Sequence, residues 1–138
     1  MGRILSIDYG SKRTGLAVTD PLKIIATGLG MVETPKLMAF LKDYIKREEV
    51  ERIIVGMPTN WDDSDTHATP LVKRFIQTLT KNFPQIPIIE VDERYTSRMA
   101  SQAIHQMGLK KKDRQAKGLV DEVAATIMLQ EYMQRGNI

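Results

Sequence analysis

The stretch from residue 3 to residue 20 constrains the fold most, because it has the pattern of two strands joined by a tight turn. An apolar run ends at Asp8, a turn built on Gly10 and Gly15 follows, and a second apolar run ends near Asp20. A carboxylate at the end of a strand can face a cleft and bind a cation, whereas its burial in mid-strand would be costly. Aspartate also caps turns with its side chain, so the hairpin alone leaves both roles open for Asp8.

The rest of the chain alternates between strand and helix patterns. The continuous apolar run at 52–58 is typical of a strand that is covered on both faces and is parallel to its neighbour. Thr34-Pro35 and Thr69-Pro70 each have the pattern of a helix N-cap followed by proline. The expected elements after the hairpin are strands at 23–32, 52–58 and 88–93, and helices after Thr34, after Thr69, near 100–107 and after Gly118. This order predicts an α/β fold in one domain, residues 1–138, with a mixed five-stranded sheet (an antiparallel meander plus parallel strands) flanked by helices.

The composition excludes several classes of site and location. The chain has no cysteine, which rules out disulfides and thiolate metal sites and is typical of a reducing compartment. No apolar stretch approaches the ~20 residues of a membrane span, and no signal-peptide pattern is present, so we expect a cytoplasmic protein without a membrane partner. Twenty basic and seventeen acidic residues give a net charge of +3, a mild preference for polyanions.

Three carboxylates are expected to converge at one edge of the sheet. If the first strand and the strands at 52–58 and 88–93 are parallel, their C-terminal ends share an edge, and open α/β sheets bind ligands there. That edge would gather Asp8 and Glu93, and the final helix would add Asp121, whose neighbours at i+3 and i+4 are alanines small enough for close approach. A simpler explanation for Asp121 is that an acid near a helix N-terminus stabilises the helix dipole.

Such a cluster suits hard cations. Carboxylate oxygens without cysteine favour Mg²⁺ or Mn²⁺. Two such ions about 3.5–4 Å apart can activate a water and stabilise the leaving oxygen of a phosphodiester. We expect Asp8 to bridge the ions, with Glu93 and Asp121 each holding one side.

Four segments together resemble the YqgF family in order and spacing. They are residues 6–17, 55–58, 92–97 and 121–130. Members of that family look like RuvC-type Holliday-junction resolvases and are regarded as nucleases that mature the 5′ end of the 16S rRNA precursor. The resemblance covers nearly the whole chain. It implies an RNase H-like fold, catalytic acids at Asp8, Glu93 and Asp121, and a divalent metal cofactor.

Basic residues flank the expected acidic cluster on both sides. Arginine and lysine in such positions can bind the phosphates on either side of a cut, and a basic run adds salt-sensitive affinity for a nucleic-acid backbone. Each cation could instead be solvated or paired with one of the acids. The candidates are Lys12, Arg13, Arg94, Arg98, Lys110, Lys111 and Lys112.

The leading hypothesis is therefore a metal-dependent nuclease that acts on structured RNA, specifically the rRNA precursor, with a ribosomal particle as a further partner. The first alternative is a resolvase of DNA junctions, which would need a stable dimer. No stretch of the sequence indicates a dimer interface, and we expect a monomer or weak dimer. A non-catalytic nucleic-acid-binding module is a second alternative, because the loop at 60–67 lacks the glycines usual in the family. An actin-like ATPase is disfavoured, because it needs two lobes and a second phosphate-binding hairpin.

Overall fold

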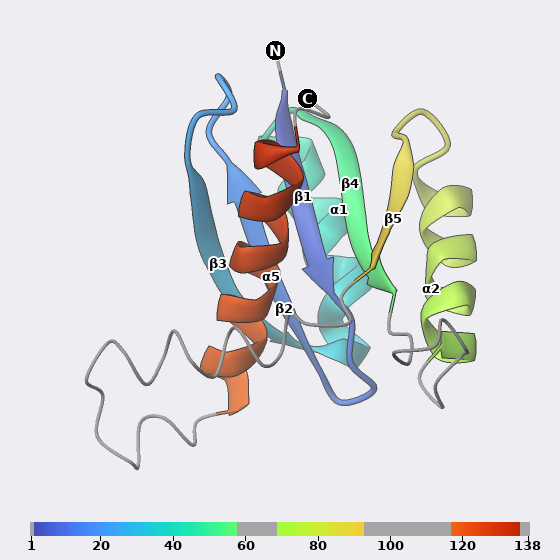
Figure 1. Cartoon of the computed structure of the whole chain (residues 1–138). Helices are drawn as coiled ribbons and strands as arrows, with labels where there is room; N and C mark the ends of the chain where they lie inside the picture. The colour runs from blue at the N-terminus through green and yellow to red at the C-terminus, as the bar shows by residue number, and fades with distance from the viewer. Residues whose placement is uncertain (1, 58–68, 93–116, 136–138) are drawn as a thin grey trace.

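The described part of the chain is a twisted five-stranded sheet with helices on both faces (Figure 1). This computed structural model describes residues 2–57, 69–92 and 117–135. The elements are β1 (Arg3–Asp8), β2 (Arg13–Thr19), β3 (Ala26–Glu33), the 3₁₀ turn η1 (Thr34–Lys36), α1 (Leu37–Arg47), β4 (Val50–Met57), α2 (Thr69–Asn82), β5 (Ile88–Asp92) and α5 (Lys117–Gln134). None of the described helices is both long and apolar enough to cross a membrane.

The sheet has the order β3-β2-β1-β4-β5, which confirms the predicted mixed topology. β1 pairs with β2 and β2 with β3 in antiparallel register. β1 pairs with β4 and β4 with β5 in parallel register. β1, β4 and β5 therefore end at the same edge, which lies at the bottom of Figure 1.

The two faces of the sheet have separate cores because side chains alternate along each strand. On β1, Leu5 and Ile7 pack under α1 and α2, while Ile4 packs under α5, and all three are fully buried. α5 lies across β1, β2 and β3 and runs in the direction opposite to β1 (Figure 1). Its N-terminal half consequently approaches the edge where β1 ends.

The third strand begins three residues later than the sequence pattern predicts. The Asp20 carboxylate accepts hydrogen bonds from the backbone N–H groups of Ile24 (2.7 Å) and Ile25 (2.8 Å). Lys23 has φ 59°, the left-handed region that suits a turn. These contacts hold residues 23–25 in the turn, and β3 starts at Ala26.

Thr34 does not cap the following helix, contrary to the expectation from its sequence. Its hydroxyl donates to the Gly10 carbonyl (2.5 Å) and lies 3.0 Å from the Thr14 hydroxyl oxygen, so it ties the β1–β2 turn to η1. Pro35 does occupy the first turn of η1. The helix expected near 100–107 lies outside the described residues.

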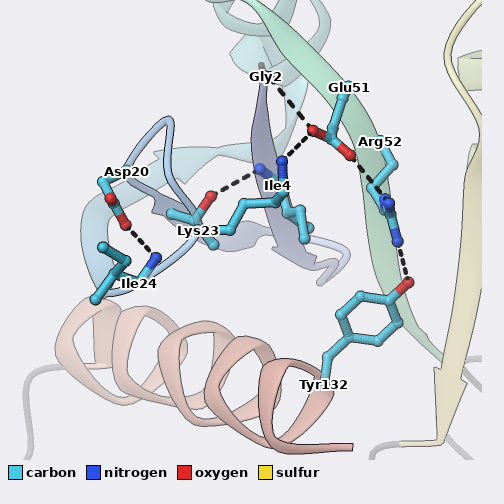
Figure 2. A network of polar contacts seen from close by, with 9 residues as sticks. Gly2, Ile4, Asp20, Lys23, Ile24, Glu51, Arg52 and Tyr132 are labelled. Atoms are coloured by element: carbon cyan, nitrogen blue, oxygen red, sulfur yellow. Dashed lines mark hydrogen bonds and ion pairs between the residues drawn. The ribbon is translucent and has the colours of Figure 1, made fainter. Parts of the chain in front are cut away.

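The opposite end of the sheet is held by a polar network around Glu51, at the start of β4 (Figure 2). The Glu51 carboxylate pairs with the Lys23 ammonium (2.6 Å) and with the Arg52 guanidinium (2.9 Å), and it accepts a hydrogen bond from the Gly2 N–H (3.3 Å). Arg52 donates in turn to the Tyr132 hydroxyl on α5 (3.1 Å). The network joins the β2–β3 turn, β4 and the last turns of α5.

Candidate active site

Asp8 is the last residue of β1 and lies at the edge where the parallel strands end. In the next parallel pair, Met57 of β4 lies opposite Asp92, the last residue of β5. The strand ends are thus aligned as the sequence pattern predicts, and residue 93 directly follows this edge in the chain. Asp8 itself is partly exposed to solvent.

A glycine brings α5 against the sheet next to Asp8. Gly15 of β2 is the direct pairing partner of Asp8. A Cβ atom on Gly15 would collide with the carbonyl oxygen of Asp121, so the backbone of α5 touches β2 at this point. Ala124 and Ala125 are buried on the same helix and permit this close approach. Asp121 consequently lies beside Asp8, although 113 positions separate them in the sequence.

A buried hydrogen bond sets the position of α5 along β1. The Ser6 hydroxyl donates to the Ala125 carbonyl (2.8 Å), and Ser6 is fully buried. Asp8 follows Ser6 by two residues on the same strand face, and Asp121 precedes Ala125 by about one helical turn. Because two strand residues rise ~6.6 Å and four helix residues rise ~6.0 Å, these nearly equal steps leave Asp8 and Asp121 at the same level.

The electrostatics of the site are those of two close carboxylates and one guanidinium. Burial and the charge of Asp8 raise the pKa of Asp121 above its usual value, and Arg13 partly offsets this. The Arg13 Nε lies 3.6 Å from the Asp121 Oδ2, an ion pair that is too long for a hydrogen bond. That Nε is buried and has no hydrogen-bond partner among the described residues. Asp121 therefore lies next to one like charge, Asp8, and one opposite charge, Arg13.

Asp121 lies too far into α5 for the simple dipole explanation. The helix begins at Lys117, and its first turn contains no acidic residue. An acid stabilises the helix dipole mainly within the first turn. The position of Asp121 is instead explained by its contact with Gly15 and by its proximity to Asp8.

The structure brings together three of the residues that the sequence suggested, namely Asp8, Asp121 and Arg13. Lys12 lies exposed on the β1–β2 turn, one residue before Arg13. Within the described ranges no three His, Asp or Glu side chains are grouped so as to hold a metal. The expected residues Glu93, Arg94, Arg98, Lys110, Lys111 and Lys112, and the loop at 60–67, lie outside the described residues.

Two residues that shape the site had no role in the sequence-based hypothesis. Ser6 is the one hydroxyl side chain in an otherwise apolar run, two residues before Asp8, and this interruption could have drawn attention to it. Gly15 was expected only to form the turn, whereas it lies within β2 and provides the contact surface for Asp121. Its role depends on a helix more than a hundred residues away, which no local pattern reveals.

Comparison with known proteins gives a consistent result. The family model described as "RuvX: Holliday junction resolvase" matches residues 2–135. A protein of Christiangramia forsetii named "Putative pre-16S rRNA nuclease" is 52% identical over 133 residues, which cover 96% of this chain and 98% of that protein. A protein of Porphyromonas gingivalis with the same name is 53% identical over 133 residues, with 96% of each chain covered.

A solved structure supports the fold. "T. thermophilus RuvC in complex with Holliday junction substrate" aligns with a TM-score of 0.58 at 16% identity and covers 99% of this chain and 97% of that chain. This similarity confirms the expected RNase H-like fold.

Proposed function

This chain belongs to the RuvX family, the YqgF family of the sequence resemblance, and from that premise we propose that it is a metal-dependent endonuclease that hydrolyses phosphodiester bonds. The observation that carries the proposal is the juxtaposition of Asp8 and Asp121, with a raised pKa at Asp121. Two neighbouring carboxylates repel each other, and a bound cation would relieve the repulsion that Arg13 only partly offsets. If Asp8 and Asp121 had a purely structural role, the fold would not need to place two like charges side by side.

The donor set fits a hard divalent cation. Asp8 and Asp121 present carboxylate oxygens, and the chain has no cysteine that would favour a softer metal. Asp8, Asp121 and Glu93 would hold Mg²⁺ or Mn²⁺, with two ions expected. When bound, such ions lower the pKa of a water and stabilise the leaving oxygen of the phosphodiester.

The protein's own contribution is position and charge. Ser6 and Gly15 keep the two carboxylates at one level, so that the backbone fixes the site before a ligand arrives. Arg13 reduces the repulsion between the acids through its ion pair with Asp121, and its guanidinium would bind a phosphate oxygen of the substrate. Lys12 adds a second cation on the exposed turn. The remaining cations proposed to bind the nucleic-acid backbone are Arg94, Arg98, Lys110, Lys111 and Lys112.

The proposed substrate is the precursor of 16S rRNA at its 5′ end, in the cytoplasm and in contact with a ribosomal particle. The name shared by the two relatives supports an RNA substrate. The test is cleavage of an RNA that spans the 5′ boundary of 16S rRNA, with Mg²⁺, with Mn²⁺ and with chelator. Metal-dependent cleavage by the wild type that is absent from Asp8→Asn would support the proposal. RNA binding that survives chelation, without cleavage, would favour the non-catalytic module.

A resolvase of four-way DNA junctions is the second candidate, because the matching family model carries that description. Symmetric junction resolution cuts two strands and therefore needs two active sites, whereas we propose a monomer or weak dimer. The same assay with a four-way DNA junction, combined with sedimentation velocity, separates the two. Paired cuts by a stable dimer would favour the resolvase.

A further inference from the structure

A pocket lies next to Asp8 but on the other face of the sheet. It has a volume of about 290 Å³ and is lined by residues that include Tyr9, Thr34, Leu71, Arg74 and Phe75. Tyr9 directly follows Asp8 and packs against the core under α1 and α2, whereas Asp8 faces α5. The pocket and the acidic cluster therefore lie on opposite faces of the sheet, and the consecutive residues Tyr9 and Asp8 contribute to them.

The walls of this pocket are preformed. The rings of Tyr9 and Phe75 are stacked, with centroids 4.4 Å apart and planes inclined by 20°. Phe75 is buried in the core, and its stacking contact restricts the position of the Tyr9 ring. The hydroxyl of Thr34, which also lines the pocket, is fixed by its hydrogen bond to the Gly10 carbonyl. Little conformational entropy would therefore be lost from these groups when a ligand binds.

The pocket combines an aromatic wall with a cation. Leu71 and Met38 contribute further apolar surface, and the Arg74 side chain is exposed on α2. Within the described residues Arg74 makes no ion pair. Aromatic side chains stack on bases, and arginine binds phosphate in a bidentate manner. The volume is close to the lower limit of ordinary ligand pockets, which suits one base rather than a larger group.

We propose that this pocket is a nucleotide subsite, in which a single-stranded base flanking the scissile phosphate contacts Tyr9 while Arg74 binds a phosphate next to it. The inference rests on the proposed nuclease function. A strand whose phosphate lies at Asp8 crosses the sheet edge and passes directly over Tyr9. Base contacts at this point anchor the strand next to the cut, without reading its sequence by hydrogen bonds.

The experiment is a scan with abasic nucleotides. A fluorescent single-stranded RNA from the 5′ boundary of 16S rRNA receives one abasic nucleotide at each position in turn, and anisotropy measures its binding in the Asp8→Asn background, which prevents cleavage. We expect one position at which base removal raises Kd about fivefold or more, the cost of one lost stack. Adding Tyr9→Leu should abolish this sensitivity, whereas Tyr9→Phe, which keeps the ring, should retain it.

Arg74 provides a test that does not disturb the core. We expect Arg74→Gln to weaken binding of every RNA in the scan and to lower the salt dependence of log K by about one phosphate contact. Lys81→Gln, the same change of charge at the far end of α2, should bind like the parent.

Either of two results would overturn the proposed subsite. One is an abasic binding profile that does not change in Tyr9→Leu. The other is an Arg74→Gln variant whose RNA affinity equals that of Lys81→Gln. A position-specific profile that depends on Tyr9, in a protein whose wild type cleaves nothing, would retain base binding at Tyr9 but reject the nuclease. Failure of the wild type to bind RNA would reject both.

Discussion

The guanidinium Nε of Arg13 lies 3.6 Å from the Asp121 carboxylate, so the candidate site contains its own counter-cation. Arg13 is the first residue of β2, and Asp121 lies in the second turn of α5. The pair is only about one-third exposed, which makes the interaction stronger than that of a fully solvated pair. Asp8 acts on Asp121 with the opposite effect, because its negative charge raises the pKa of Asp121 while Arg13 lowers it.

We expect Arg13→Gln to raise the affinity for Mn²⁺ about fivefold while it lowers RNA cleavage. Removing a positive charge next to the carboxylates favours any cation that binds there, whereas the substrate phosphate loses a contact. Titration calorimetry with Mn²⁺ measures the first effect. Arg47→Gln is the matched control, because it breaks an exposed arginine–aspartate pair on α1, and its Mn²⁺ affinity should be unchanged. Weaker Mn²⁺ binding in Arg13→Gln would contradict this role.

We expect Asp8→Asn to reduce cleavage about a hundredfold or more without loss of folding. The substitution removes a proposed metal ligand at a partly exposed strand end, and it also removes a source of repulsion on Asp121. The metal-free variant should therefore melt at the same temperature as the wild type or higher. Asp43→Asn, on the exposed face of α1, should cleave normally. Retained cleavage in Asp8→Asn would remove Asp8 from the mechanism.

We expect Ser6→Ala to lower the stability by about 1 kcal/mol, the usual net value of one buried hydrogen bond, and to lower kcat about tenfold. The stability loss reflects the bond to Ala125, and the loss of kcat reflects a shift of Asp121 relative to Asp8. Urea unfolding and single-turnover cleavage measure the two effects.

Thr126→Val is the control for Ser6→Ala. It removes a hydroxyl that bonds within α5, to the Glu122 carbonyl, and so does not join the helix to the sheet. Its kcat should stay within about twofold of the wild type. If Ser6→Ala changed stability but not kcat, the bond would hold the fold without positioning Asp121.

The sheet could be predicted from the sequence because local patterns carry most of its information. The hairpin and the buried run of β4 indicated the order and direction of the strands, and the Thr69-Pro70 signal indicated the start of α2. The predicted start of β3 and the predicted cap at Thr34 were wrong because a side chain forms a hydrogen bond to a backbone group that the local pattern does not reveal. Asp20 holds the N–H groups of Ile24 and Ile25 in a turn, and the Thr34 hydroxyl bonds to Gly10 instead of capping a helix.

The site was less predictable than the fold. The convergence of Asp8 and Asp121 follows from strand directions and could be inferred. The level of α5 along β1 depends on a bond between Ser6 and Ala125, which are 119 positions apart, and periodicity contains no information about it. For the same reason, the sequence left open whether Arg13 would be solvated or paired, and the structure shows the pair with Asp121.

We expect Gly15→Ala to destabilise the protein by about 3 kcal/mol and to weaken Mn²⁺ binding. The added methyl group would meet the backbone carbonyl of Asp121, which can yield only if α5 moves away from β2. Gly28→Ala on β3 is the matched control, because its methyl group would meet the Glu122 side chain (2.6 Å), which can rotate. That variant should lose about 1 kcal/mol or less. Equal losses in both variants would show that α5 adjusts without cost.

We expect Glu51→Gln to lower the melting temperature by about 2–4 °C at pH 7, and this difference to disappear in acid. Hydrogen bonds from Lys23, Arg52 and the Gly2 N–H hold the pKa of Glu51 below its ordinary value of 4.5. A carboxyl group with a lowered pKa stabilises the fold above its unfolded-state pKa and loses this effect as the pH falls through its folded-state pKa. The gap should therefore be constant from pH 7 to about pH 5 and should close below about pH 4.5.

Glu33→Gln controls for the removal of an exposed ion pair. Its partner Lys36 lies 3.9 Å away and both side chains are largely exposed, so screening by water should keep the change in melting temperature below about 1 °C at every pH. Melting curves from pH 3 to pH 7 compare the two variants with the wild type. A deficit in Glu51→Gln that persisted at pH 3 would mean that the substitution acts through packing, and the network in Figure 2 would then not be stabilised by the charge of Glu51.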